Sequence, residues 1–309
     1  MSFISVLVAL LLEQVRPLSR GNPVHAALRA WVRWNARNFD AGKAVHGGLA
    51  WSISVILPAV GATTVHWLLD IFVGWPATVV WSVAVLYVTL GFRQFSFHFT
   101  EIRDALADGN EALARELLAN WRQVDEGDLP QTEIVRHVIE HSVLSAHRHV
   151  FGVLAWFSLL AALGFGPAGA VLYRLAEFVA RYWQHASQTR LLPVSEALTK
   201  MASYAWAVID WVPSRITALG FAVVGSFEEA IDCWRNYEQR VPGDNDGIVL
   251  AATSGAVNIR LQGVEGQSEL FPGQPPELAH LAVVVGLVWR TVVMWMVLLA
   301  LLTLARLLG

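Results

Sequence analysis

The chain has 309 residues, of which 55% are hydrophobic and only 15% are charged, with 14 tryptophans and a formal net charge of −3 at pH 7. This balance argues against a soluble domain, because several apolar runs are long enough, or nearly so, to cross a bilayer. No basic patch indicates nucleic-acid binding, and the single cysteine, Cys233, excludes an intrachain disulfide and a cysteine-based zinc cluster. We therefore predict an all-α fold: a polytopic membrane helical bundle with amphipathic and cytoplasmic helices.

The first third of the chain combines apolar runs with one basic segment. Residues 3–12 are apolar but short for a span, and they lack the basic start and cleavage site of a secretory signal. Residues 13–48 carry six basic residues against two acidic ones, which is typical of an amphipathic helix lying on a membrane surface. Residues 49–73 predict a clear span, 74–76 a tight turn, and 77–92 a return across the membrane.

The middle third is more polar. Residues 99–121 predict a polar helical region with a break at 108–110, where aspartate, glycine and asparagine follow one another. Residues 132–163 are amphipathic at first and then apolar. A turn rich in glycine and proline at 164–167 sends the chain back through 168–183. The segments 3–12, 151–163 and 168–183 either span the membrane or re-enter it from one side.

The last third is organised around residues 209–218, where one acid and one base flank a proline between two apolar runs. Proline suits the first turn of a helix, because its missing N–H would have no intrahelical partner there. We therefore predict a helix that begins at Pro213, is capped by Asp210 and holds Arg215 in its first turn.

The remaining segments are a loop region and a final span. Residues 217–224 are apolar enough to dip into the membrane. Residues 241–276 are rich in glycine, proline and aspartate and predict a soluble loop. Residues 281–308 are the longest apolar run.

The basic residues predict an orientation. Of the 22 lysines and arginines, six fall in each of the segments 13–48, 93–150 and 184–280, and the turns at 74–76 and 164–167 carry none. The positive-inside rule places these three segments in the cytoplasm. We expect a single integral membrane domain over residues 1–309 of an inner-membrane protein, with six crossings, both termini outside and mainly cytoplasmic insertions at 93–150 and 184–280.

Two short motifs raise the question of metal binding. His137, Glu140 and His141 fit the H-x-x-E-H pattern, in which two histidines on one helix face bind zinc. The pattern lacks a nearby third ligand, and the alternative is the polar side of an amphipathic helix that His147 and His149 continue. The aspartates at 244–247 do not match the spacing of a calcium loop, so a turn is expected there and no metal site is predicted.

A third group of charges lies in the apolar segment 168–183. Glu177 and Arg181 are four residues apart and can form an ion pair on one helix face. Tyr173 and Arg174 precede them. Two interpretations stay open: a structural ion pair inside the bundle, or a cytoplasm-facing polar cavity that binds an anionic or amide-bearing ligand.

Three segments together resemble a known family. Residues 166–174 form a Gly/Pro turn followed by Tyr-Arg, residues 209–218 contain Trp-Val-Pro-x-Arg, and residues 254–263 are small and end in Arg-Leu-x-Gly. This combination resembles the CobD/CbiB family of cobalamin-biosynthesis membrane proteins and its relative AmpE. With the charged group above, it gives the ligand-binding candidates Tyr173, Arg174, Glu177, Arg181, Asp210, Arg215 and Arg260.

The resemblance implies a function and leaves an alternative open. The synthases of the family join an aminopropanol-type linker to adenosylcobyric acid, a nucleotide-dependent step for which ATP and magnesium would be needed. Residues 143–149 hold no carboxylate where those synthases carry an acidic segment, and Glu177 and Ala180 stand where they carry Asn and Asp. The alternative is therefore a non-enzymatic, AmpE-like sensor linked to cell-wall signalling and β-lactamase regulation. The expected partners are the lipid bilayer, a corrinoid and a second copy of the chain, with no nucleic acid.

Overall fold

The computed structural model describes residues 2–16, 23–122, 129–189, 194–261, 271 and 273–308. Within this part of the chain the fold is helical, as predicted. It contains no strand there, and an isolated bridge joins Ile259 to Gln274. The chain divides into two compact units, which are described separately.

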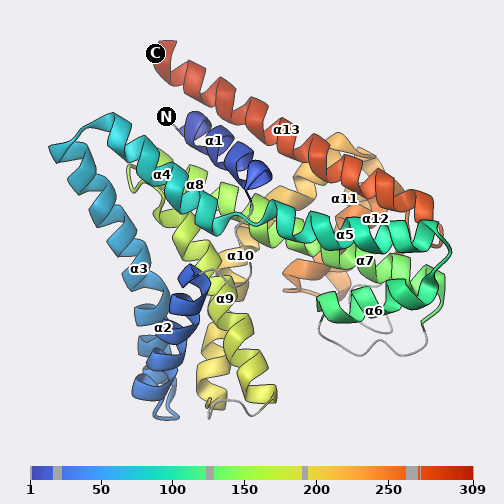
Figure 1. The fold of residues 1–309 in the computed structure, drawn as a ribbon, viewed down its shortest axis with the longest axis horizontal. Coiled ribbons are helices and arrows are strands. Elements are labelled where there is room, and N and C mark those ends of the chain that lie inside the picture. Colours follow the sequence, from blue (N-terminus) through green and yellow to red (C-terminus); the bar gives the residue numbers. More distant parts are fainter. Residues whose placement is uncertain are drawn as a thin grey trace. The chain divides into compact units, whose positions relative to one another are not determined.

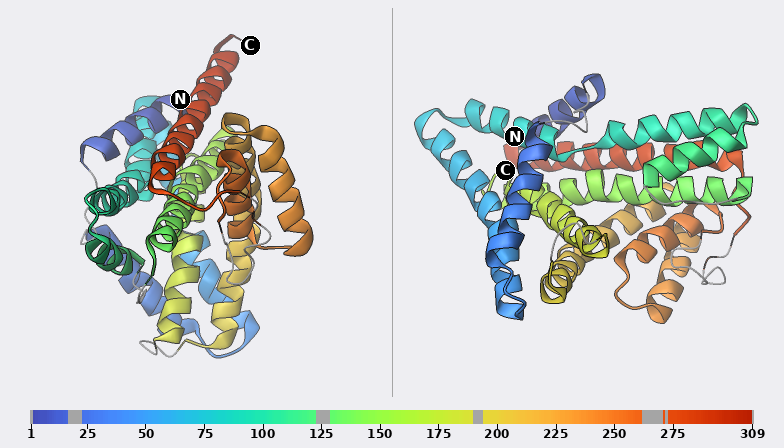
Figure 2. Two further views of the ribbon diagram at one scale, coloured as in Figure 1. Left: turned by 90° about the vertical axis from the view of Figure 1, so that its right-hand side faces the viewer. Right: turned by 60° about the horizontal axis from the view of Figure 1, so that its bottom comes forward.

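Unit 1 consists of Met1–Gly91 and Gly152–Val212. Within it, α3 packs against α2, α4 and α9, while α8 packs against α9 (Figures 1 and 2). Its helices are α1 (Ser2–Val15), α2 (Pro23–Phe39), α3 (Ala44–Phe72), α4 (Trp75–Thr89), α8 (Gly152–Ala162), α9 (Ala168–Gln188) and the first part of α10 (Glu196–Val224).

The α8–α9 turn of unit 1 lies where the sequence predicts it and is fixed to α3. Gly164 and Gly166 both have positive φ angles, which glycine adopts without strain. The indole of Trp67 donates a hydrogen bond of 2.9 Å to the Gly164 carbonyl oxygen. A Cβ on Gly169 would lie 2.0 Å from the carbonyl oxygen of Trp156, so the small residues of this segment let α8 and α9 approach closely.

Unit 2 consists of Phe92–Phe151 and Pro213–Gly309. In it, α7 packs against α5, α6, α12 and α13, and α11 packs against α12. The predicted break at 108–110 separates α5 from α6. Its elements are α5 (Phe92–Ala107), α6 (Glu111–Arg122), α7 (Gln131–Ala146), the π-helical turn η1 (His147–Phe151), the rest of α10, α11 (Phe227–Arg240), α12 (Asn245–Val257) and α13 (Leu278–Leu308).

The loop predicted over 241–276 is wrong for its first half, because α12 lies there. Most side chains of this helix are buried. A Cβ on Gly255 would lie 2.3 Å from the carbonyl oxygen of Glu229, and one on Gly225 would lie 2.7 Å from the Cβ of Ala256. Small residues therefore bring the backbones of α11 and α12 together, which is a packing signal that composition alone presents as a loop.

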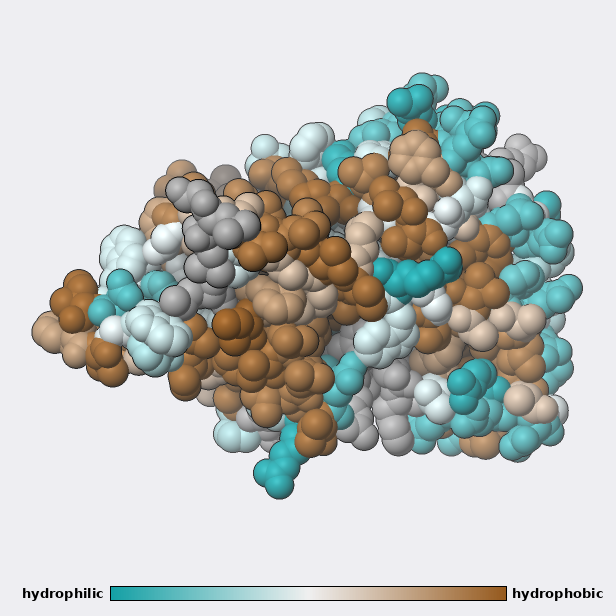
Figure 3. Space-filling model, turned by 90° about the horizontal axis from the view of Figure 1, so that it is seen from above, coloured by the Kyte–Doolittle hydropathy of each residue, from teal (hydrophilic) through white to brown (hydrophobic). Residues whose placement is uncertain are grey.

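Among the described residues, four helical segments are long and apolar enough to cross a membrane: Ala44–Phe72, Gln131–Ala162, Glu196–Val224 and Leu278–Ala305. Two shorter apolar helices, Phe3–Val15 and Trp75–Thr89, accompany them. The exposed side chains of α3 include Leu57, Val60 and Ile71, and Figure 3 shows hydrophobic side chains gathered over broad parts of the face it draws. A water-facing surface would not carry such areas, so these helices are suited to lipid.

The candidate spans of the structure differ in part from the predicted set. The sequence assigned a span to 168–183, but α9 carries three charged residues and is not among the candidate spans. Two of the candidate spans lie within segments that were expected to be mainly cytoplasmic: Glu196–Val224 within 184–280, and Gln131–Ala162, which begins within 93–150.

The predicted helix start at Pro213 is also wrong, because Pro213 lies inside α10. A proline inside a helix leaves the carbonyl group four residues earlier without its usual N–H donor. That carbonyl belongs to Ile209, and the indole N–H of Trp156 donates to it at 3.0 Å. A side chain from α8 thus replaces the hydrogen bond that Pro213 removes, and the helix continues.

Candidate functional site

The candidates in unit 1 form two adjoining groups. In the first, the hydroxyl of Tyr173 donates a hydrogen bond of 2.7 Å to Asp210 Oδ1, and both residues are fully buried. A Cβ on Gly152 would lie 2.0 Å from the Tyr173 ring, so this glycine makes room for the phenol. Asp210 is therefore held by a tyrosine of α9 and does not cap a helix.

The second group confirms the predicted pairing of Glu177 with Arg181. Arg181 Nη1 donates to Glu177 Oε1 at 3.2 Å, and Arg174 donates to the other carboxylate oxygen. The Glu177 side chain is only 4% exposed, whereas that of Arg181 is 54% exposed. A buried carboxylate needs such partners, because an ion without them would be costly to take out of water.

Arg215 belongs to a different group, in unit 2. Its Nη1 donates to Asn245 Oδ1 at 3.0 Å and to Ser214 Oγ at 3.3 Å, and its Nη2 donates to Glu238. Contrary to the prediction, Arg215 therefore does not lie in the first turn of a helix. It joins α10 to α11 and to the start of α12.

A second arginine reaches the same helix start. Arg148, in the π-helical turn η1, donates to the carboxylate of Asp246, the residue after Asn245. The preceding residue, His147, has its Nδ1 2.9 Å from Thr217 Oγ1, and both of these residues are fully buried. We call His147, Arg148, Arg215, Glu238, Asn245 and Asp246 the α12 cluster.

The local geometry of the α12 cluster is set by the cap of α12. Asp244 accepts a hydrogen bond of 3.1 Å from the Gly247 N–H and one of 2.6 Å from the Tyr237 hydroxyl. Burial and the hydrogen bond to Asp244 raise the pKa of the Tyr237 phenol above its usual range. Asp244 satisfies the first turn of α12, which leaves the side chains of Asn245 and Asp246 to meet the two arginines.

The α12 cluster has the groups that bind carboxylates, phosphates and amides. Arginine holds carboxylate or phosphate oxygens through parallel N–H donors, and asparagine both donates to and accepts from amides. The π-helical turn that supplies Arg148 is a feature often found at functional sites. In the structure, the protein's own carboxylates, Glu238 and Asp246, contact the two guanidinium groups.

The H-x-x-E-H motif does not form a metal centre with other described residues. Glu140 lies 3.6 Å from His137 Nδ1 and 3.9 Å from Arg136 Nε, and the His141 ring packs edge-on against Trp121. In the described part of the chain, no group of three or more histidines, cysteines, aspartates or glutamates is placed to hold a metal ion.

Arg260 is also in unit 2 but is not a member of the α12 cluster. Its side chain is exposed, and its backbone N–H donates to the Gln274 carbonyl oxygen at 2.8 Å. Residues 262 and 263, which complete the Arg-Leu-x-Gly segment, lie outside the described residues.

Sequence reasoning found Arg215 but missed the rest of the α12 cluster. The His-Arg-His run at 147–149 was interpreted as the polar side of an amphipathic helix, and the residues at 244–247 as a turn. The signal available in the sequence was a run of three basic or titratable residues directly before the apolar segment 151–163. Asp246, the partner of Arg148, lies 98 residues further along the chain.

Comparisons with known proteins give one consistent result. The family described as CobD/Cbib protein matches residues 4–269. A protein of Stutzerimonas stutzeri named cobalamin biosynthesis protein CobD is 29% identical over 96% of both chains. A protein with the same name from Chromobacterium violaceum is 31% identical over 63% of this chain and 59% of its own length. One from Leptospira interrogans is 27% identical over 84% of this chain and 81% of its own length. No solved structure matches the chain, and the AmpE-like alternative has no support in these comparisons.

Proposed function

The chain belongs to the CobD/CbiB family, and we propose that it is a membrane enzyme of cobalamin biosynthesis that attaches an aminopropanol-type linker to adenosylcobyric acid through an amide bond. The proposal is supported by the family match over most of the chain and by relatives named for cobalamin biosynthesis.

The observation that carries the site assignment is the contact set of Arg215. This arginine belongs to the Trp-Val-Pro-x-Arg segment on which the family resemblance rests. Its guanidinium meets an amide, a hydroxyl and a carboxylate side by side. Amide formation requires a carboxylate to be held and its charge offset, and a guanidinium does both.

The remaining members of the α12 cluster have supporting roles in this proposal. Asn245 is suited to hydrogen-bond an amide-bearing ligand such as a corrinoid, and Arg148 supplies a second cation beside it. His147, fully buried against Thr217, fixes the backbone that carries Arg148. Since Glu238 and Asp246 are each about one-third exposed, a ligand carboxylate could exchange with them at the two arginines.

ATP and magnesium, which the family resemblance implies, are not assigned to residues. The carboxylates that contact the arginines of the α12 cluster are engaged in ion pairs, and the described residues offer no three-ligand group for a metal ion.

The expected orientation in the inner membrane completes the proposal. The basic residues outside the apolar runs favour a cytoplasmic location for the 93–150 segment. In a Cys233→Ser background, we expect Asp108→Cys to be protected from a membrane-impermeant thiol reagent in intact cells, and Val73→Cys to react. Both positions are exposed on the protein, so the opposite pattern would reverse the orientation.

Complementation tests the function. A strain that lacks its own synthase and must make cobalamin from cobyric acid should grow when it expresses this chain. Arg215→Lys should abolish growth although the protein is inserted, whereas Arg235→Lys, an exposed position on α11, should leave growth unchanged. Failure of the wild-type chain despite confirmed membrane expression would reject the enzymatic proposal. Full growth of Arg215→Lys would remove Arg215 from the site.

A further inference from the structure

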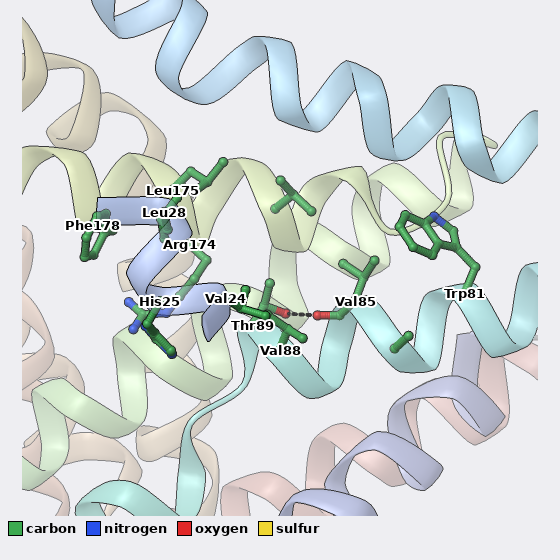
Figure 4. A pocket seen from close by; sticks show the side chains of 12 residues that line it. Val24, His25, Leu28, Trp81, Val85, Val88, Thr89, Arg174, Leu175 and Phe178 are labelled. Atoms are coloured by element: carbon green, nitrogen blue, oxygen red, sulfur yellow. Dashed lines mark hydrogen bonds between the residues drawn. The ribbon is translucent and has the colours of Figure 1, made fainter. Parts of the chain in front are cut away.

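Unit 1 contains a cavity of about 330 Å³ between α2, α4 and α9 (Figure 4). Its lining residues belong to unit 1, whereas the α12 cluster belongs to unit 2. This volume lies at the lower end of the range of ~300–1,000 Å³ that is typical of small-molecule sites. Most of its lining is aliphatic or aromatic, including Leu28, Val85, Val88 and Phe178. The cavity thus suits an apolar group.

The basic side chains of this cavity, His25 and Arg174, lie on α2 and α9. The Thr89 hydroxyl also lines it but is already bonded to the carbonyl oxygens of Val85 and Leu86, at 2.9 and 3.2 Å. Figure 4 shows His25 and Arg174 on the lining, with the valines of α4 further along the cavity. One part of the cavity is therefore basic and the rest is apolar.

Arg29 of α2 adds to the positive charge around His25. Burial lowers the pKa of His25, and the charges of Arg174 and Arg29 lower it further, so both guanidinium groups act on this imidazole. Glu177 is the carboxylate on α9 that faces Arg174, and it is shared with Arg181. Helix α2 (Pro23–Phe39) contains three arginines and no acidic residue. An anion near His25 would relieve this repulsion.

The helices around the cavity indicate where such an anion would come from. α4 is a short apolar helix with exposed side chains such as Val80, and α2 is amphipathic and basic. A basic amphipathic helix beside an apolar helix is the arrangement expected at the boundary between headgroups and acyl chains. A molecule with a phosphate at one end and an alkyl chain at the other matches both parts of the cavity.

We propose that this cavity is a site for one anionic phospholipid of the surrounding bilayer, with an acyl chain along Val85 and Val88 and the phosphate beside His25, Arg29 and Arg174. The proposal does not depend on the function assigned to the α12 cluster. It assigns to unit 1 a lipid that stabilises the packing of α2 against α4 and α9.

The test uses the full chain purified in a neutral detergent. Its thermal unfolding is followed while mixed micelles containing phosphatidylglycerol, phosphatidylcholine or no phospholipid are added, and lipid that copurifies is identified by mass spectrometry. We expect phosphatidylglycerol to copurify and to raise the unfolding temperature more than phosphatidylcholine does. Glycerol phosphate, which has the phosphate but no acyl chain, should have no effect.

Two variants separate the parts of the site. Ala84→Trp fills the cavity from an exposed position on α4 and should abolish lipid stabilisation, whereas Val80→Trp, exposed on the same helix and outside the lining, should not. Arg29→Gln should lower the preference for phosphatidylglycerol, with Arg37→Gln as its control. Equal stabilisation by both lipids in the wild type, unchanged stabilisation in Ala84→Trp, or a response to glycerol phosphate equal to that of the lipid would each overturn the proposal. Growth in the complementation assay reports separately on the α12 cluster.

Discussion

Replacing Arg215 tests both the structure of the α12 cluster and its role. In Arg215→Ala, Asn245, which is only 8% exposed, loses a charged donor to its side-chain oxygen. The loss of a buried hydrogen bond from a charged donor costs ~1–3 kcal/mol. Glu238 also loses its cation, but its side chain is 37% exposed and keeps the indole N–H of Trp234 at 3.0 Å, so this loss adds about 1 kcal/mol or less.

The free energy of unfolding should therefore fall by ~2–4 kcal/mol in Arg215→Ala. Arg215→Lys retains a charge for Glu238 but cannot reach Asn245 and Ser214 with the same parallel donors, so we expect a smaller loss of ~1–2 kcal/mol. Arg235→Ala, at an exposed position of α11, is the control and should change stability by less than ~0.5 kcal/mol.

Equilibrium unfolding in mixed micelles of a mild detergent and sodium dodecyl sulfate gives these differences. The free energy of unfolding should fall most in Arg215→Ala, less in Arg215→Lys and least in the control, Arg235→Ala. If Arg215→Ala unfolds within ~0.5 kcal/mol of the wild type, the guanidinium does not make these contacts and the site assignment loses its basis. If Arg215→Lys loses much of its free energy of unfolding but still complements normally, Arg215 has a purely structural role.

Three other predictions follow from individual contacts. Trp156→Phe should cost ~1–2 kcal/mol of stability, because it removes the donor to the Ile209 carbonyl oxygen. This cost should be smaller in a Pro213→Ala background, where the backbone N–H of residue 213 supplies the donor again. If the effects of the two substitutions simply add, the contact between Trp156 and Ile209 is contradicted. Because the pKa of Tyr237 is raised above its unfolded value of 10.0, the stability it contributes is present below pH 10 and is lost as pH rises above that value. The wild type should therefore lose more stability than Tyr237→Phe between about pH 9.5 and 11, and parallel curves for the two proteins would refute this. Gly255→Ala should destabilise unit 2 strongly, since its Cβ would meet the backbone of α11 at 2.3 Å, and wild-type unfolding of this variant would show that the two helices are not so close.

The sequence was sufficient where local chemistry decides the structure. Apolar runs located the candidate spans at 49–73 and 281–308, and a spacing of four residues predicted the ion pair between Glu177 and Arg181. The glycine and proline content located the turn at 164–167, where Gly164 and Gly166 have positive φ angles. Each of these features depends on residues that are neighbours along the chain or on one helix face.

It was insufficient where a distant residue changes the local outcome. Pro213 favours a helix start by itself, but Trp156, 53 residues earlier, satisfies the carbonyl that the proline leaves without a donor. Similarly, Arg215 was recognisable as a candidate, but its partner Asn245 was not. Asn245 lies at the start of α12, a helix that the sequence analysis predicted to be a loop because the segment is rich in small residues. Tertiary packing decides both cases, and no periodicity in the sequence reports it.

The most direct measurement of the proposed activity is amide formation by the purified protein. The chain, reconstituted in lipid nanodiscs, is incubated with adenosylcobyric acid, the aminopropanol-type linker, ATP and magnesium, and the corrinoids are separated and weighed by mass spectrometry. We expect a product whose mass is the sum of the two reactants less one water, formed by the wild type and by Arg235→Lys but not by Arg215→Lys. No product from folded wild-type protein, under conditions in which an active synthase of the same family forms it, would contradict the proposed function.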